Sequence, residues 1–246
     1  MQSMLNNALS VLGREALRIV LPSSCVGCGG ELPWRDRVSS CCGPCWRSLP
    51  RIESAKCRSC ALPLPLPTTD NRQPTTCLRC SADPLPLEWC EAWGEYRGGL
   101  ESVLHAFKFE RHDFLADPLA ELMAGVVRDR EFDALIPVPM YPARQRRRGY
   151  NQADLLARAL GRELSLPVRP ELLKKRKEKA RQSALARTAR EENVRGVFEA
   201  SDDARNLAIL IVDDICTTGE TLRACAQTLV ARGASRVCAI SAAKAL

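Results

Sequence analysis

Apolar residues after about residue 88 fall into two alternating patterns. Short apolar runs, which are typical of buried strands, occupy residues 134–138, 207–212 and 235–241, and residues 91–96 alternate weakly as a strand can. Apolar residues at helical spacing occupy residues 100–109, 114–130, 151–164 and 219–232. Strands that alternate with helices in this way predict an α/β fold, with a parallel sheet that helices cover on both faces.

The front third of the chain has a different composition and lacks this periodicity. It is rich in cysteine and proline, and its Leu-Pro repeats disfavour helix. Residues 4–21 are amphipathic and are not followed by a cleavage site, so we expect a short helix rather than an export signal. The sequence therefore predicts three parts: an N-terminal amphipathic helix at 1–21, a small Cys-rich domain at 22–88 and an α/β domain at 89–246.

The sequence shows neither a membrane-spanning run nor an export signal, and both observations bear on the cellular location of the protein. No apolar run approaches the roughly 18 residues that a membrane span needs, so we expect no membrane-spanning segment. Without an export signal, we expect a cytoplasmic and reducing environment, in which clustered cysteines bind metals more often than they form disulfides.

Eight of the 13 cysteines form four Cys-x-x-Cys pairs. Such a pair directs two sulfurs at one ion, and two pairs complete a tetrahedral thiolate shell for Zn²⁺. We expect two structural zinc sites, because all four positions are filled by protein. Interleaved pairing, a redox role for one pair, and replacement of Cys42 by Cys41 remain open. The simplest assignment is sequential, with Cys25, Cys28, Cys42 and Cys45 in one site and Cys57, Cys60, Cys77 and Cys80 in the other.

A candidate phosphate loop follows the apolar run 209–212. Asp213 and Asp214 come directly after that run, and a helix begins near Gly219. The carboxyl end of a buried parallel strand is where ligands bind in α/β sheets, and a turn at a helix N-terminus gathers backbone N–H groups that favour a phosphate. The carboxylates suit the vicinal hydroxyls of a ribose, directly or through Mg²⁺. Further hydroxyl donors come from Thr217, Thr218 and Thr221.

The run from 212 to 221 resembles the ribose-5-phosphate signature of type I phosphoribosyltransferases. Residues 136–142, Arg144 and residues 148–152 resemble the pyrophosphate-loop region and the helix after it. Together with the eight-cysteine front end, the resemblance extends over residues 22–245 and points to the ComF family, which is known for roles in natural competence and the use of external DNA. A later stretch of the same subgroup is matched by Gln182, Arg187, Arg190, Asn193 and residues 196–198.

The resemblance implies a type I phosphoribosyltransferase-like sheet behind a double zinc ribbon, with a site for phosphoribosyl diphosphate and Mg²⁺. Asp213 and Asp214 would bind the ribose hydroxyls and Mg²⁺, and they would be the catalytic residues if transfer occurs. Arg144 and the backbone near Tyr141 would face the pyrophosphate. The full implied ligand-binding set is Tyr141, Arg144, Asp213, Asp214, Cys216, Thr217, Thr218, Gly219, Glu220 and Thr221.

The charge of the chain is concentrated in one segment. Residues 144–195 hold 16 Lys and Arg against 6 Asp and Glu, a balance of +10 within a chain of +7. This favours an anionic partner, either a phosphorylated small molecule or single-stranded DNA, and a solvated helix surface stays open as the alternative. Residues 174–179 contain five basic residues, so we expect a loose segment that orders around an anion.

Three functions stay open at this level. The chain is a competence factor that binds phosphoribosyl diphosphate and handles DNA, an active phosphoribosyltransferase acting on a base or an amine, or a regulatory scaffold for other competence proteins. No acceptor-recognition element or general base is evident in the sequence, so enzymatic turnover is left undecided.

Overall fold

The computed structural model describes residues 24–33, 40–65, 75–110, 112–176 and 197–246. The predicted helix at 1–21, and positions 182, 187, 190, 193 and 196 of the family resemblance, lie outside them. Contacts divide the chain into two units. Unit 1 comprises Met1–Pro50 and Arg97–Leu115, and unit 2 comprises Arg51–Tyr96 and Ala116–Leu246. The predicted domain boundary at residue 88 stays a prediction, whereas the contacts place the second cysteine segment in the same unit as the sheet.

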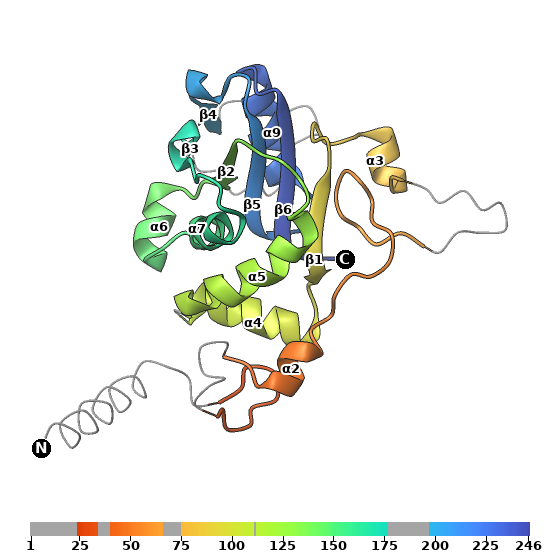
Figure 1. The fold of residues 1–246 in the computed structure, drawn as a ribbon, viewed down its shortest axis with the longest axis vertical. Coiled ribbons are helices and arrows are strands. Elements are labelled where there is room, and N and C mark those ends of the chain that lie inside the picture. Colours follow the sequence, from red (N-terminus) through yellow and green to blue (C-terminus); the bar gives the residue numbers. More distant parts are fainter. Residues whose placement is uncertain (1–23, 34–39, 66–74, 111, 177–196) are drawn as a thin grey trace, which may run out of the picture. The chain divides into compact units, whose positions relative to one another are not determined.

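Unit 2 is built on a four-stranded sheet in the order β1-β6-β5-β2 (Figure 1). Every neighbouring pair is parallel, as the alternating pattern predicts. The strand residues are largely buried, because helices cover both faces. The strands are β1 (Cys90–Glu95), β2 (Ala134–Pro137), β5 (Ala208–Cys216) and β6 (Arg236–Lys244).

Helices cover the sheet on both sides (Figure 1). α5 (Ala116–Val127) packs on β1 and β6, and α7 (Gln152–Leu164) packs on β2 and β5. On the other face, α9 (Glu220–Ala231) packs on β6. No helix in the described part of the chain is both long enough and apolar enough to cross a bilayer. The smaller elements of unit 2 are α3 (Leu78–Ala82), α6 (Pro142–Arg148), the antiparallel pair β3 (Leu173–Lys175) and β4 (Phe198–Ala200), and 3-10 turns at Pro170–Leu172 and Asp202–Ala204.

Three sequence predictions need correction. The predicted strand at 235–241 ends too early, since β6 continues to Lys244. The predicted strand at 207–212 ends too early, since β5 continues through both aspartates to Cys216, where it pairs with Lys244. The apolar run stops at Val212, but the strand does not, because β6 still supplies a hydrogen-bonded partner. The helix α6 was not predicted at all. It has Pro142 in its first turn and four arginines among seven residues, so it lacks the apolar period by which helices are found.

Unit 1 combines the first cysteine segment with α2 (Gly43–Arg47), α4 (Gly98–Phe109) and a 3-10 turn at Asp113–Leu115. Leu49 and Gly99 fix the contact between the cysteine segment and α4. A methyl group added at Gly99 would lie 3.2 Å from Leu49 Cδ2, so the two segments approach closely there. Leu32, Leu100 and Phe107 are fully buried and provide much of the core of this small unit.

Candidate functional site

The two aspartates lie at the end of β5, on opposite sides of the strand. Successive side chains of a strand point to opposite faces, so Asp213 interacts electrostatically with Cys225 in α9 and Asp214 with Arg148 in α6. Asp214 is buried and Asp213 is half-buried. The Asp213 carboxylate also accepts a 2.9 Å hydrogen bond from the Asp214 N–H. The site therefore has two acidic groups that approach the strand end from both faces of the sheet.

The loop after β5 runs from Thr217 to Gly219 and leads into α9. Thr217 and Thr218 are exposed, whereas Gly219 is buried and has a φ of 83°, a left-handed conformation that favours glycine. The Gly219 carbonyl accepts from the Arg223 N–H at 2.8 Å, which closes the first turn of α9. The loop thus reaches the N-terminus of a 12-residue helix, where unpaired N–H groups attract an anion.

The loop after β2 lies beside the end of β5. Pro137 pairs with Val212, and the Val138 N–H donates to the Val212 carbonyl at 2.9 Å. The buried Asn151 anchors this connection, because its side-chain amide donates to the Val138 carbonyl at 3.0 Å while its oxygen caps α7 at the Ala153 N–H. Parallel strands β2 and β5 therefore deliver both candidate loops, residues 138–141 and 217–219, to one edge of the sheet.

The first loop brings cationic side chains to this edge. Tyr141 is the residue before α6, and its carbonyl accepts from the Arg144 and Gln145 N–H groups. Arg144 is exposed, whereas Arg148 is half-buried and interacts with Asp214. Burial and the nearby charge of Arg144 lower the pKa of the Arg148 guanidinium, whereas the charge of Asp214 raises it. The guanidinium remains cationic, because arginine is not deprotonated in proteins. Sequence reasoning placed Arg148 in the resembling motif but not in the site, and the structure adds it.

A buried lysine lies beneath the second loop. Lys244, at the end of β6, is 4% exposed, and its ammonium donates to the Thr217 carbonyl. It also lies 4.0 Å from Cys216 Sγ. A hydrogen bond with Cys90 and the charge of Lys244 together lower the pKa of Cys216 to about 7, against the opposing effect of burial. Lys244 thus fixes the start of the loop and places a positive charge under it.

The four cysteine pairs form two groups of four sulfurs. Within each group all sulfurs lie within 4.8 Å of one another. Zn²⁺ with thiolates at about 2.3 Å requires sulfurs about 3.8 Å apart in a tetrahedron, and Cys28–Cys42 at 3.9 Å and Cys60–Cys77 at 3.8 Å match this spacing. The residues therefore fit a structural zinc ion in each group. The groups are sequential: Cys25, Cys28, Cys42 and Cys45 in unit 1, and Cys57, Cys60, Cys77 and Cys80 in unit 2.

The environment of the first group separates Cys25 from its neighbour Cys41. Burial raises the pKa of the Cys25 thiol, but N–H donors of Cys42, Cys28 and Gly27 outweigh it and bring that pKa down to about 6. Two of these donors lie 3.3 Å from Cys25 Sγ. Burial raises the pKa of Cys41 well above its usual range. Cys41 Sγ accepts a 3.8 Å contact from Cys25 Sγ. The group whose four sulfurs all lie within 4.8 Å of one another nevertheless contains Cys42 and not Cys41.

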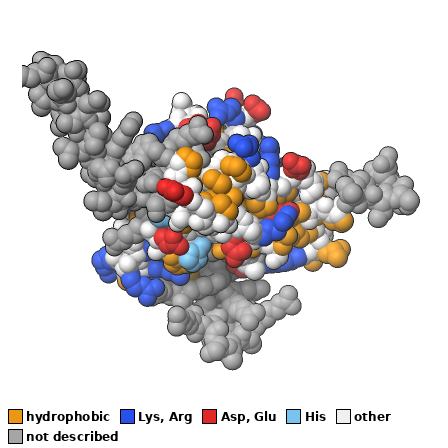
Figure 2. Space-filling view, turned by 90° about the horizontal axis from the view of Figure 1, so that it is seen from below, with side chains coloured by type: hydrophobic (Ala, Val, Ile, Leu, Met, Phe, Trp, Pro, Cys, Tyr) orange, Lys and Arg blue, Asp and Glu red, His pale blue; other side chains and the backbone are white. Residues whose placement is uncertain are grey.

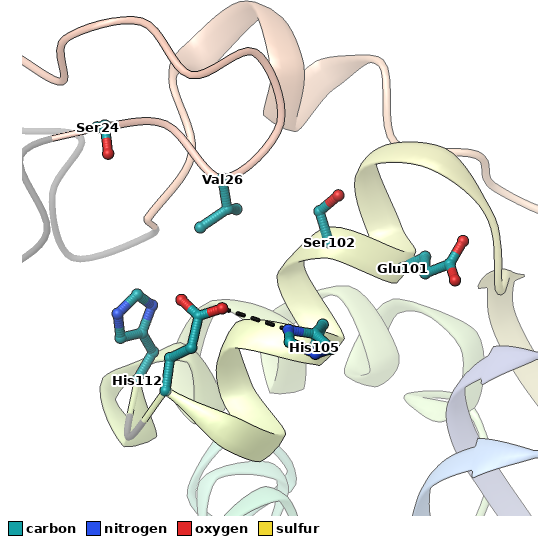
Figure 3. Close-up of a pocket in the computed structure, with 7 residues that line it drawn as sticks. Ser24, Val26, Glu101, Ser102, His105 and His112 are labelled. Carbon is teal, nitrogen blue, oxygen red and sulfur yellow. Dashed lines mark hydrogen bonds and ion pairs between the residues drawn. The ribbon is translucent and has the colours of Figure 1, made fainter.

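Unit 1 also contains a cavity of about 650 Å³ beside the first group (Figure 3). Ser24 and Val26 line it from the cysteine segment, and Glu101, Ser102 and His105 line it from α4. Glu110 and His112 also line it. Glu110 pairs with His105 at 3.3 Å, and His112 is hydrogen-bonded to Ser40 at 3.0 Å. Neither histidine shares a metal group among the described residues.

Comparison with known proteins agrees with this architecture. Residues 109–245 match the phosphoribosyl transferase domain family, and residues 16–81 match the double zinc ribbon domain family. The DNA utilization protein YhgH of Shigella flexneri is 31% identical over 203 residues, which cover 80% of this chain and 86% of that protein. Competence protein F of Haemophilus influenzae is 33% identical over 154 residues, which cover 58% of this chain and 67% of that protein.

A third relative matches a smaller share of both chains. Competence protein ComFC of Bacillus subtilis is 31% identical over 141 residues, which cover 56% of this chain and 51% of that protein. The fold, the two four-cysteine groups and the family matches together define a double-zinc-ribbon protein with a type I phosphoribosyltransferase fold. The chain belongs to the ComF family.

Proposed function

We propose that this protein binds phosphoribosyl diphosphate with Mg²⁺ at the edge of the sheet formed by β2 and β5, and that it does so in the use of external DNA during competence. The observation that carries the ligand is the convergence of the two loops beside Asp213 and Asp214. The biological role is supported by the relatives, two of which are named competence proteins and one a DNA utilization protein.

Each part of the site suits one part of the ligand. The N–H groups of the loop at 217–221 suit the 5′-phosphate. The carboxylates of Asp213 and Asp214 suit the ribose hydroxyls and would hold Mg²⁺, which would neutralise diphosphate charge. Arg144 and Arg148 in α6 lie on the side where the pyrophosphate would extend, since α6 follows the β2 loop. The proposed ligand therefore spans both loops, with its negative groups next to cationic side chains and backbone N–H donors.

The test is calorimetry with phosphoribosyl diphosphate and MgCl₂. Replacing both aspartates (Asp213→Asn, Asp214→Asn) should weaken binding at least about a hundredfold, because two charge-assisted contacts are lost. The matched control is the surface pair Asp202→Asn, Asp203→Asn, which lies in a 3-10 turn of the same unit and should leave the affinity unchanged. Equal affinity in the site variant and the wild type would refute the assignment. Pyrophosphate release with an added base or amine would extend the proposal to catalysis.

A basic surface supports a DNA contact in the same unit. Arg144, Arg146 and Arg147 are exposed on α6, and Lys174 and Lys175 line a cavity of about 410 Å³ beside it. By contrast, Lys and Arg side chains on the face drawn in Figure 2 lie among Asp and Glu side chains. We therefore place single-stranded DNA along the described part of the 144–195 segment. Affinity that is insensitive to salt would contradict this placement, because phosphate contacts release counterions.

A further inference from the structure

The second ribbon, defined here by its described residues 52–65 and 75–87, packs directly on the candidate phosphate loop. Leu85 is buried against Gly219, and a methyl group added at Gly219 would lie 2.9 Å from Leu85 Cδ1. At that distance a larger side chain at position 219 would require Leu85 to move. The left-handed turn of the loop is therefore held from outside by a residue of the ribbon.

Arg223 links the ribbon to the first turn of α9. Its guanidinium donates to both carboxylate oxygens of Asp83, at 3.1 and 3.0 Å, and to the carbonyls of Asp83 and Pro84, at 3.1 and 3.0 Å. The Arg223 side chain is only 13% exposed, whereas that of Asp83 is 70% exposed, so the arginine is packed while its acidic partner faces solvent. A bidentate, charge-assisted pair of this kind fixes the relative orientation of the two side chains as well as their distance. Because the Arg223 N–H also binds the Gly219 carbonyl, one residue joins the ribbon to the loop.

Two further contacts involve the zinc knuckles themselves. Cys216, at the start of the loop, donates through Sγ to the Cys60 carbonyl at 3.8 Å. Arg79, next to the ligand Cys80, forms a 2.5 Å ion pair with Glu220 at the start of α9. The ribbon therefore contacts the last residue of β5, the glycine that ends the loop and the first residue of α9.

We propose that the second ribbon is a positioning element for the phosphate loop, so that loss of zinc from it weakens binding of the phosphorylated ligand. This inference rests on the proposed function. A loop binds a phosphate well only when its N–H groups already converge, because ordering a free residue on binding has an entropic cost. A folded ribbon supplies that order before the ligand arrives. Asp83, Leu85 and Arg223 are the positioning residues, and none of them needs to touch the ligand.

The first ribbon provides a matched control within the same chain. Cys77→Ser, Cys80→Ser removes two ligands of the second group, and Cys42→Ser, Cys45→Ser removes the equivalent pair of the first. Each variant should retain about one zinc per chain by metal analysis. Calorimetry with phosphoribosyl diphosphate and MgCl₂ should show at least a roughly tenfold loss of affinity for the former and a change within about twofold for the latter. Equal effects of the two variants would overturn the proposal.

A second variant keeps the test valid if the cysteine variant does not fold. Arg223→Met leaves both zinc groups intact and should weaken binding about tenfold or more, because it removes the four hydrogen bonds by which a largely buried side chain holds Asp83 and Pro84. Arg223→Lys should recover part of the loss. The control is Arg128→Met, which removes an exposed arginine of the same unit that pairs only loosely with Glu163, at 3.9 Å. Unchanged affinity in Arg223→Met, with wild-type binding intact, would overturn the positioning role. Wild-type protein that does not bind at all would instead refute the proposed function.

Discussion

The two ribbons share a motif and differ in what surrounds it. Both contain two Cys-x-x-Cys pairs whose four sulfurs lie within 4.8 Å. In the first, Cys28 is exposed and Cys42 and Cys45 are half-buried, and the group belongs to a small unit with α4. In the second, three of the four cysteines are buried, and they share a hydrophobic cluster with residues of β5 and β6.

The difference in surroundings shows that the Cys-x-x-Cys motif determines which ion is bound, but not which part of the protein the ion stabilises. The first ribbon stabilises its own unit and lines a cavity there. The second is part of the core beneath the candidate site, because Cys57 and Cys60 are packed in the same cluster as Ile209 and Ile211. Two sites with equal chemistry should therefore respond differently to the same change.

The largest expected effect comes from the first cysteine of each ribbon. Cys57→Ser and Cys25→Ser alter residues that are 0% and 2% exposed, so the two changes are matched in burial. Because structural zinc contributes its binding free energy to folding, each should cost several kcal/mol. Only Cys57→Ser should accelerate amide hydrogen exchange in β5 and β6. Faster exchange in these strands after Cys25→Ser would show that the comparison is wrong.

A smaller effect is expected at the glycines that face each ribbon. Gly219→Ala combines a φ of 83° with a clash against Leu85, and should destabilise unit 2 by about 1–3 kcal/mol. Gly99→Ala lies in α4 at 3.2 Å from Leu49 and should stay within about 1 kcal/mol of the wild type. Thermal unfolding of both variants measures the difference. Adding Leu85→Ala to the first variant should relieve the clash but not the backbone strain.

The smallest effect is expected at the exposed ion pair. Arg79→Gln removes the ion pair with Glu220. The Arg79 side chain is 51% exposed and the Glu220 side chain is 40% exposed. Pairs of this exposure contribute about 0–1 kcal/mol and are screened by salt. The variant should therefore bind the ligand a few-fold more weakly than the wild type at low salt. At 0.5 M salt, where the Debye length is roughly 4 Å, the two affinities should be almost equal because the ion pair is screened. A large loss that persists at high salt would mean that Arg79 contacts the ligand itself.

Much of the fold was predictable because its signals are local. Strands and helices of unit 2 follow the apolar periodicity, and the sulfur groups follow from two-residue spacing between cysteines. The end of β5 was not predictable, since Asp213 and Asp214 interrupt the apolar run while β6 continues to pair with Asp213 and with residues 215–216. Helix α6 was missed because arginines occupy its positions without an apolar stripe.

The contact between ribbon and loop was also beyond sequence reasoning. Arg79 and Glu220 are 141 positions apart, and Arg223 and Asp83 are 140 apart. Neither pair belongs to a motif, and each residue alone is an ordinary surface charge. Arg148 is an intermediate case, because it stands in the motif at 148–152, but only the structure shows that it faces Asp214.

The strand order has a consequence for biosynthesis. β1 lies at the edge of the sheet, and its partner in the described sheet is β6, which begins at Arg236. At about 5–20 residues per second, a ribosome needs on the order of ten seconds to make the intervening chain. During that interval the buried face of β1 and the cysteines of the second ribbon have no sheet to pack against. Prompt delivery of zinc to the nascent chain would protect those thiols, so zinc supply during translation should govern the yield of folded protein.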